Sequence, residues 1–374
     1  MKFSIGKTEL LRGLTRLQSI VEKRNTMPIL ANVLIEARTE GKEGVLELAA
    51  TDLEVSVRSV QRADVGTPGR VTAPAKKLYE ILRELPDEPV QIESTPNSYL
   101  SLRCARTAFE LAGNSAEEYP ALPELAPGET VAVPGLLLGQ MIERTMYAAS
   151  TDETRYNLNG VFVEYQAETG KLRMVATDGH RLAYVDRPLG VEFKGLGRGV
   201  IIPRKGLTEL KRLVDEEDVD EVELGFEGST ALVRKRGVTL SMRLIEGEFP
   251  NYRQVIPQPG KHQIVMPVEP LIQALRRVII VAAERSRAVK IELGSGTLRL
   301  SSNNPDVGEA REELDADYMG EELTVAFNAR YLLDALSYLG SKEVRLGLHD
   351  AVSPAQLAPA DDGDSFAVVM PMRL

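Results

Sequence analysis

Residues 175–183 read VATDGHRLA, an apolar strand that runs into a small polar tip and out again. The first third of the chain holds a similar stretch, LELAATDLEVSV at residues 46–57, and the last third holds LRLSSNNPDVGEA at residues 298–310. Apolar and polar residues alternate before each tip, which is the period of a half-buried β-strand. The tips (Thr51-Asp52, Thr177-Asp178 and Ser302-Asn303) lie about 125 residues apart, roughly one domain length. This spacing indicates an internal repeat.

The segments around the tips repeat in the same order. An alternating strand precedes each tip, at residues 27–37, 156–165 and 288–296. A short strand, a break and an amphipathic helix follow it, at residues 71–85, 200–214 and 325–339. A longer helix opens each third, at residues 7–23, 134–150 and 268–284. We therefore predict an α+β fold made of three copies of one unit.

Two stretches rich in proline and glycine separate the copies. They are PELAPGE at residues 123–129 and IPQPGK at residues 256–261. They predict domains over residues 1–125, 129–256 and 261–374. The chain has 374 residues, which is more than one hydrophobic core usually serves.

Composition excludes several classes of protein. Cys104 is the only cysteine, so no internal disulfide or cysteine-rich zinc site can form, and Cys104 itself is expected to be a small apolar residue without a role. No apolar run approaches the ~20 residues that span a bilayer, and charges interrupt the apolar pattern of the N-terminus, unlike a secretory signal. We expect a cytoplasmic protein that does not contact membranes.

The net charge of −10 argues against nucleic-acid binding when it is taken as a sum, but the charge is unevenly distributed. Acidic residues concentrate at residues 215–223, 309–317 and 361–364, whereas the predicted helices are rich in Lys and Arg at equivalent positions of the repeats. A single basic helix face is usually just solvated. Repeated basic faces that share one surface could instead hold DNA by its phosphates.

Four short motifs add to the three repeats. They are MPILANVL at residues 27–34, ATDGHRLA at 176–183, FPNYRQVIP at 249–257 and VVMPMRL at 368–374. Together they resemble the bacterial DNA polymerase III beta subunit family, the β sliding clamps. The resemblance extends from Met1 to Leu374.

The resemblance implies a processivity factor for DNA replication that is not an enzyme and carries no cofactor or metal. In this family two chains join head to tail in a ring of six domains, with helices inside and sheets outside. Duplex DNA passes through the ring without sequence readout. The implied partners are the DNA polymerase III alpha subunit, the clamp loader and other clamp-binding-motif proteins. A lining helix of ~16 residues is about 24 Å long, which suits a ring around a duplex.

The resemblance also implies a cleft between the second and third domains that binds partner peptides ending in a Leu-Phe-like pair. Apolar walls with flexible methionines suit such varied ligands. This chain has Gln254 where the family pattern YRRV has its second arginine. The implied cleft residues are Leu158, Thr177, Gly179, His180, Arg181, Leu182, Pro250, Val255, Val368, Met370, Pro371, Met372 and Arg373.

Two more surfaces follow from the resemblance. Its DNA-contacting positions correspond to Arg24, Arg155, Arg204 and Lys205, although Arg24 could equally be an ordinary surface charge. Its ring joint corresponds to Ile280 and Val281 of one chain against Phe109 and Leu111 of the other. Arg103 and Arg106 could pair there with Glu309, Glu312 and Glu313. Ile280 and Val281 could alternatively be buried within their own domain.

Residues alone leave other functions open for TDGHR. Asp178 and His180 could serve a DNA-modifying hydrolase, with Arg181 holding an anion. Yet the chain has only three histidines without metal-ligand spacing, it lacks a P-loop, and the other two tips lack the His-Arg pair. A plain turn at Asp178-Gly179 is the simpler alternative. A monomeric three-domain scaffold is another.

Overall fold

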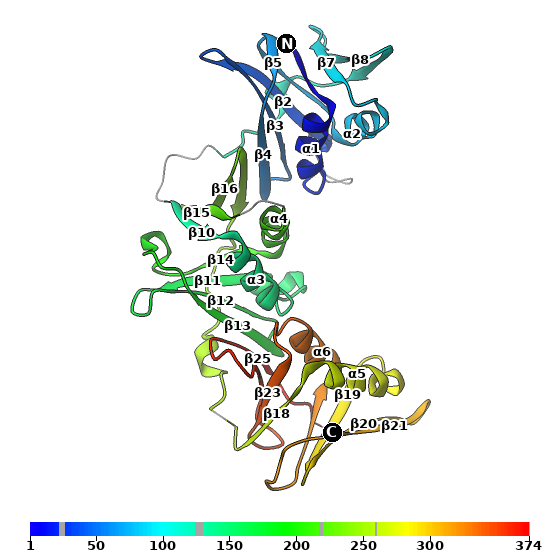
Figure 1. Cartoon of the computed structure of the whole chain (residues 1–374), viewed down its shortest axis with the longest axis vertical. Helices are drawn as coiled ribbons and strands as arrows, with labels where there is room; N and C mark the ends of the chain where they lie inside the picture. Colours follow the sequence, from blue (N-terminus) through cyan, green and yellow to red (C-terminus); the bar gives the residue numbers. More distant parts are fainter. Residues whose placement is uncertain (22–26, 124–129, 217–219, 259, 374) are drawn as a thin grey trace. The chain divides into compact units, whose positions relative to one another are not determined.

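The computed structural model describes residues 1–21, 27–123, 130–216, 220–258 and 260–373, which form two compact units (Figure 1). Unit 1 contains residues 1–135 and 208–244, and unit 2 contains residues 136–207 and 245–374. Both units mix short helices with antiparallel sheets, as an α+β fold requires.

Unit 1 holds the first repeat and part of the second. The first repeat contains β1 (Lys2–Gly6), α1 (Lys7–Leu17), η1 (Pro28–Ala31), β2 (Asn32–Glu40), β3 (Glu43–Thr51), β4 (Val55–Arg62), β5 (Asp64–Thr67), β6 (Gly69–Pro74), α2 (Ala75–Glu84), β7 (Pro89–Ser94), β8 (Tyr99–Cys104), β9 (Thr107–Ala112) and η2 (Ala116–Glu118). The part of the second repeat contains β10 (Thr130–Pro134), β15 (Glu221–Glu227), β16 (Thr230–Lys235) and β17 (Val238–Arg243).

Unit 2 holds the remainder of the second repeat and the whole third repeat. The former contains α3 (Gly135–Met146), η3 (Glu153–Leu158), β11 (Gly160–Gln166), β12 (Lys171–Thr177), β13 (Arg181–Pro188), η4 (Lys194–Leu196), β14 (Val200–Pro203), α4 (Arg204–Val214), which crosses into unit 1, and η5 (Tyr252–Gln254). The third repeat contains β18 (His262–Pro267), α5 (Val268–Val278), η6 (Ile279–Val281), β19 (Ala288–Gly294), β20 (Thr297–Asn304), β21 (Gly308–Asp315), β22 (Leu323–Asn328), α6 (Ala329–Ser337), β23 (Glu343–Leu348), β24 (Ala355–Pro359) and β25 (Ser365–Val369).

Each repeat shares a sheet with the next one. In unit 1 an eight-stranded sheet has the order β10-β15-β16-β17-β4-β3-β2-β6, and in unit 2 another has the order β14-β11-β12-β13-β25-β24-β23-β18. The joining pairs are β4 with β17 and β13 with β25, both antiparallel. The strand that follows the tip of one repeat therefore pairs with the last strand of the next repeat.

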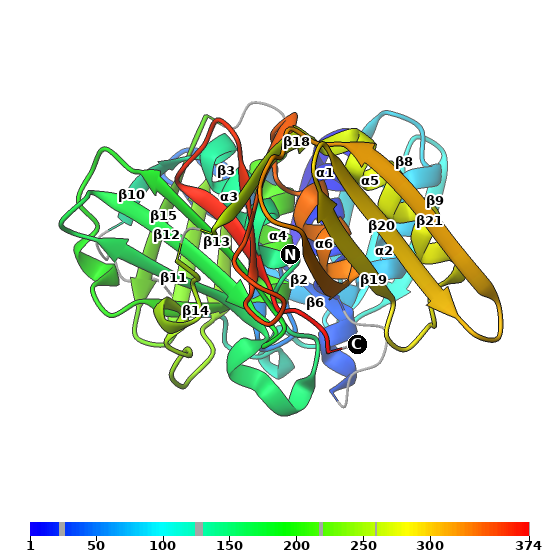
Figure 2. The ribbon, with the colours of Figure 1, turned by 90° about the horizontal axis from the view of Figure 1, so that it is seen from below.

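The two remaining sheets each belong to one repeat. A five-stranded sheet has the order β5-β1-β7-β8-β9, and a four-stranded sheet has the order β21-β20-β19-β22. In unit 2, α5 lies beside α6 and packs against β20 and β21 (Figure 2). The strand that follows the third tip, β21, and the last strand of the first repeat, β9, are both sheet edges.

The helices pack through apolar residues one turn apart, as their periodicity predicts. In α1 the buried face is formed by Leu10, Leu14 and Leu17, and in α5 by Leu271, Leu275 and Val278. Ile264, Phe327 and Leu346, from strands on both sides, complete the buried core around α5 and α6.

Two expectations about these elements are wrong in detail. The opening helices have 11, 12 and 11 residues rather than ~16, because each ends before the apolar pattern does. Residues 279–281 continue the pattern as a 3₁₀ turn and Ala282 is extended. The third turn also lies later than Ser302-Asn303: β20 continues to Asn304, whose side-chain oxygen accepts a hydrogen bond from the Asp306 amide at 3.1 Å.

Candidate functional site

The TDGHR stretch forms a tight turn between β12 and β13. The Asp178 carboxylate accepts hydrogen bonds from the backbone amides of His180 and Arg181 at 2.9 and 3.1 Å. The Thr177 hydroxyl accepts one from the Gly179 amide at 3.1 Å and donates one to the Arg181 carbonyl at 2.6 Å. Gly179 takes the positive φ of 88° that the turn requires, which costs a glycine little. The predicted turn at Asp178-Gly179 is confirmed.

The first repeat contains the same turn with different residues. The Asp52 carboxylate accepts from the amides of Glu54 and Val55 at 2.9 and 2.7 Å, and the Thr51 hydroxyl accepts from the Leu53 amide at 3.0 Å. Thr-Asp is therefore a turn-forming pair in both repeats. Because Asp178 is used in the same way as Asp52, its carboxylate needs no catalytic role to explain it.

Arg181 is held firmly inside unit 2. Its guanidinium donates to Asp334 at 2.6 Å, to the Asp178 carboxylate at 3.0 Å and to the Tyr147 carbonyl at 2.8 Å. It also stacks 4.7 Å above the Tyr331 ring. These contacts join β13 to the helices of both repeats in this unit. The Arg181 side chain therefore serves mainly to stabilise the fold.

His180 lies at the exposed side of the turn, beside the C-terminal segment. Its carbonyl accepts a hydrogen bond from the Met370 amide at 2.9 Å, and its ring stacks on Tyr331 with centroids 6.2 Å apart. Met370 is 40% exposed. The Met372 amide then bonds the Ala326 carbonyl at 2.7 Å, which fixes the end of the described chain. Pro371 is half-buried and Arg373 is exposed.

One face of the unit 2 sheet brings several of the implied cleft residues together. Directly opposed pairs in the register are Thr177 with Leu182 and Leu182 with Val368, and Met370 continues this face by the period of two. Leu182 and Val368 are buried in a cluster with Val175 and Tyr252. The exposed end of this face is therefore apolar, with His180 and Met370 at its margin.

The segment between β17 and β18 lies against the same face. Tyr252 is 4% exposed and belongs to the cluster with Leu182 and Val368, whereas Pro250 and Val255 on either side of it are exposed. Gln254 is exposed too, and its backbone amide bonds the Asn251 carbonyl. The Asn157 side chain donates to the Glu248 carbonyl at 3.1 Å, which joins this segment to η3. Leu158, at the end of η3, is 8% exposed and thus presents little surface.

The implied DNA-contacting residues differ in their freedom. Arg24 lies outside the described residues. Arg155 is exposed, although its guanidinium donates to the Asp178 carbonyl at 3.1 Å. Arg204 donates to the Ala149 carbonyl at 3.1 Å, and both Arg204 and Lys205 are half-buried with further interactions. Arg155 is therefore the most accessible of the described cations in this set.

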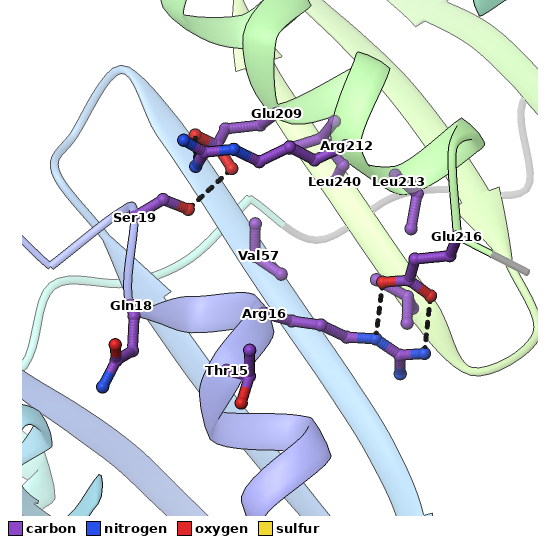
Figure 3. A pocket seen from close by; sticks show the side chains of 11 residues that line it. Thr15, Arg16, Gln18, Ser19, Val57, Glu209, Arg212, Leu213, Glu216 and Leu240 are labelled. Carbon is purple, nitrogen blue, oxygen red and sulfur yellow. Dashed lines mark hydrogen bonds and ion pairs between the residues drawn. The ribbon is translucent and has the colours of Figure 1, made fainter. Parts of the chain in front are cut away.

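The basic helix faces are partly neutralised within the chain. In unit 1, Arg16 of α1 makes a bidentate pair with Glu216 at 2.8 and 3.0 Å, and the Ser19 hydroxyl donates to Glu209 (Figure 3). These pairs border a pocket of about 390 Å³ whose apolar lining includes Val57. Burial disfavours ionised Glu216, but the hydrogen bonds and charge of Arg16 outweigh burial and lower its pKa. Acidic residues thus reduce the basic charge that sequence counting predicts.

The residues implied for a ring joint lie on the edge strand β9 and in η6, which contacts the edge strand β21. Phe109 on β9 is 37% exposed and Leu111 is half-buried. Ile280 is 77% exposed, directly after α5 and in contact range of β21, so burial of Ile280 in its own domain is wrong. Val281 is half-buried.

The acidic residues of β21 already have partners in the same chain. Glu309 pairs with Arg311, Glu312 with Arg277 and Glu313 with Arg299. Pairing with Arg103 and Arg106 would have to compete with these contacts.

Sequence reasoning missed a polar network under the 249–256 segment. Glu164, Arg173 and Asp186 lie directly opposite one another on β11, β12 and β13. Arg173 donates to both Asp186 oxygens at 2.7 and 2.8 Å, to Glu164 at 3.3 Å and to the Tyr252 hydroxyl at 3.1 Å. The signal was present, since each of the three strands carries a charged residue among its apolar ones: Glu164, Arg173 and Asp186.

Three helix-and-sheet repeats joined through shared sheets make up the fold, and comparison with known proteins identifies the family. Models of the DNA polymerase III beta subunit match here: the N-terminal domain at residues 1–123, the central domain at 132–251 and the C-terminal domain at 253–373. The chain belongs to the DNA polymerase III beta subunit family, the β sliding clamps. It is accordingly a non-catalytic subunit.

Individual relatives agree along the full length. The beta sliding clamp of Pseudomonas putida is 37% identical over 376 residues and that of Escherichia coli is 35% identical over 377 residues, with 100% of each chain covered. The crystal structure of the DNA polymerase III subunit beta from Pseudomonas aeruginosa matches with a TM-score of 0.93 at 36% identity, again over 100% of both chains. A sliding clamp of the same species bound to griselimycin matches equally well, with a TM-score of 0.93 at 36% identity and 100% of both chains covered. Within the described ranges, no helix has the length and apolarity to cross a membrane.

Proposed function

We propose that two copies of this chain close head to tail around duplex DNA and act as a cytoplasmic processivity clamp. The proposed domains are residues 1–125, 129–256 and 261–374. Partner proteins dock on the apolar sheet face between the second and third domains, and the ring holds DNA topologically rather than by affinity.

The pairing rule between repeats carries this proposal. β4 pairs with β17 and β13 pairs with β25, so each strand that follows a tip pairs with the last strand of the next repeat. Among the described residues, the equivalent strand of the third repeat, β21, and the last strand of the first repeat, β9, each pair on one side only. An unpaired edge strand is a template for another chain. If β21 of one copy pairs with β9 of another copy, the strand that follows each of the three tips pairs with the last strand of the next repeat.

Exposed apolar side chains support the same joint. Ile280, beside β21, is 77% exposed, and Phe109, on β9, is 37% exposed. Burying both across a joint would contribute about 2 kcal/mol for each side chain. The charged pairs at these edges are exposed and contribute little, ~0–1 kcal/mol each.

The docking site is proposed from the implied cleft residues that are accessible. His180, Met370, Pro250 and Val255 border an apolar floor formed by Leu182 and Val368. Methionine and valine side chains at such a border accept varied apolar residues, and backbone groups of the C-terminal segment can orient an extended peptide. Thr177, Gly179 and Arg181 support this border by building the turn, while Leu158, Pro371, Met372 and Arg373 lie around it.

The DNA contacts are proposed to be few and weak. Of the residues that the structure describes, we propose Arg155 as the first DNA contact, because it is exposed, followed by Arg204 and Lys205. Arg24 is proposed as a further contact from the resemblance. Phosphate contacts of this kind carry no sequence information, which suits a ring that must slide.

Retention on circular DNA tests the proposed function. The protein is loaded on nicked circular DNA with a bacterial clamp loader and ATP, the complex is isolated in moderately high salt, and the circle is then cut once. We expect the protein to stay on circles and to leave after linearisation. The solution mass should be twice 41.1 kDa.

Two matched variants make the test specific to the joint. Ile280→Glu should lower the dimer mass to that of one chain and abolish retention, whereas Val352→Glu, at a residue that is 74% exposed in a loop, should change neither. A wild-type protein that washes off circles, or that stays equally well on linear DNA, would contradict the topological link. A mass of one chain would favour the monomeric scaffold.

A further inference from the structure

The docking border formed by Pro250 and Val255 lies in a segment without strand pairing. Over residues 249–256, all of which the structure describes, the backbone hydrogen bonds are local, from the Gln254 amide to the Asn251 carbonyl and from the Val255 amide to the Tyr252 carbonyl. Such a segment needs side-chain anchors if its exposed residues are to keep one position.

Tyr252 anchors this segment, together with Arg253, whose guanidinium donates to Glu164 at 3.0 Å. Its ring is buried between Phe162, Tyr184 and Phe249, with centroid distances of 6.3, 6.3 and 6.5 Å. Its hydroxyl donates to Glu164 and accepts from Arg173 at 3.1 Å. Burial raises the pKa of Tyr252 to about 12, with the hydrogen bond to Glu164 acting in the same direction. The hydroxyl therefore stays protonated and keeps both partners at neutral pH.

Arg173 is in turn held by the sheet rather than by the segment. It makes a bidentate pair with Asp186, which is buried, and stacks 4.8 Å above the Tyr184 ring. The Tyr184 hydroxyl donates to Asp186 at 2.8 Å. A planar guanidinium fixed on one side by a bidentate pair presents its remaining N–H groups in a defined direction.

We infer that Arg173 is a positioning residue for the proposed docking site: through Tyr252 it fixes the segment that carries Pro250 and Val255 on the sheet face. The inference rests on the proposed docking function. Aromatic packing alone would keep Tyr252 buried without setting its height or rotation on the sheet. Arg173 and Glu164 supply two directional contacts to its hydroxyl, and a border held in its bound position loses less entropy when a peptide binds.

Arg187 provides a matched control. Its side chain is 16% exposed and pairs with Asp362, whereas that of Arg173 is 13% exposed and pairs with Asp186. Arg187 also lies on the sheet of unit 2, on β13, and it donates to Asp362 and to the Asp186 carbonyl rather than to the described 249–256 segment. Replacing it removes an ion pair of similar exposure without removing the hydrogen bond to Tyr252.

The test compares Arg173→Met, Arg187→Met and wild type in the full-length protein. Hydrogen exchange is measured at the Gln254 and Val255 amides, and affinity is measured with a synthetic peptide that carries a glutamine and ends in Leu-Phe. We expect Arg173→Met to speed exchange at these amides at least tenfold and to weaken the peptide about tenfold. Arg187→Met should leave both unchanged even if its melting temperature falls by a similar amount.

A second variant covers the case in which Arg173→Met does not fold. Tyr252→Phe keeps the ring and removes only the hydroxyl, so it should speed the same amides and weaken the peptide in the same direction. Unchanged exchange and affinity in both variants would overturn the inference. If wild type does not bind the peptide, the docking proposal fails on its own, and the exchange rates still decide whether Arg173 positions the segment.

Discussion

The turns at residues 51–55 and 177–181 have the same hydrogen bonds but different surroundings. In both, a threonine hydroxyl and an aspartate carboxylate bind the next backbone amides, and the third residue has a positive φ, 77° at Leu53 and 88° at Gly179. After the first turn the chain continues with Val55, which is fully buried. After the second it continues with Arg181, which pairs with Asp334.

This difference separates what builds the fold from what serves function. Thr-Asp would attract attention as part of a catalytic motif if only residues 177–181 were considered. The first repeat shows that the same pair closes a hairpin where no catalytic motif follows it. What distinguishes the second turn is the exposed His180 beside Met370 and the apolar sheet face below them.

Removing Arg181 should have the largest effect of any change at either turn. Arg181→Met leaves Asp334 and the Tyr147 carbonyl without a donor that the structure uses, in a half-buried setting. We expect the free energy of unfolding to fall by about 2–3 kcal/mol. Urea titration measures it, with spectroscopic signals from residues of unit 2 as the readout. Arg299→Met, which breaks an exposed pair with Glu313, should cost about 1 kcal/mol or less. Equal losses in the two variants would show that Arg181 is not a structural joint.

Replacing Asp178 should destabilise the protein more than replacing Asp52. Asp52→Ala removes the acceptor of two backbone amides and should cost about 1–2 kcal/mol. Asp178→Ala removes the same acceptor and also a partner of Arg181, so its cost should be larger. Thermal unfolding of both variants checks this, with Asp→Asn at each position as the control that keeps an oxygen acceptor. A larger loss for Asp52→Ala would break the comparison.

Substitutions at the third residue of the two turns should change stability in opposite directions. Leu53 is an L-residue in the left-handed region, where the backbone costs roughly 1–2 kcal/mol, so Leu53→Gly should stabilise the protein by about 1 kcal/mol. Gly179→Ala should destabilise it by about the same amount. Calorimetric midpoints decide this, and destabilisation by Leu53→Gly would mean that its side chain makes contacts that outweigh the strain.

Tyr119 should give the first turn an effect on stability that depends on pH in alkali. Its hydroxyl accepts from the Thr51 amide at 3.2 Å, and burial raises its pKa to about 12. A raised folded-state pKa means that the stabilisation is present below the unfolded value of about 10 and is lost as pH rises from about 10 to 12. Tyr119→Phe should therefore flatten the fall of stability between pH 10 and 11.5 by about 1 kcal/mol relative to wild type. Parallel curves would contradict this.

Much of the repeat organisation could be predicted from the sequence because it is local. Alternating strands on both sides of Thr-Asp define the first two hairpins, and the buried leucines of α1 follow the predicted helical spacing. Helix ends were predicted less well, since Ile279 to Val281 are apolar enough to continue α5 but adopt a tighter turn. The third turn lies one residue or more after its predicted position at Ser302-Asn303, because the Asn304 side chain can close the hairpin as well as that of Asn303.

The shared sheets and the polar network could not be predicted in the same way. Pairing of β4 with β17 joins residues far apart in sequence, and nothing in either strand specifies its partner. The Arg173 network likewise depends on the register of three strands and on a tyrosine from a separate segment. The implied cleft residues were found through resemblance, while the residue that positions their border becomes visible only when these contacts are known.

The most direct test of the central claim is to give the second turn the residues of the first. Gly179→Leu with His180→Glu reproduces Leu53-Glu54 on an unchanged Thr-Asp pair, and peptide affinity is measured by titration beside the melting temperature. We predict a folded protein whose melting temperature falls by only a few degrees and whose peptide affinity falls at least tenfold. Retained affinity would contradict the claim that docking belongs to the side chains around the second turn.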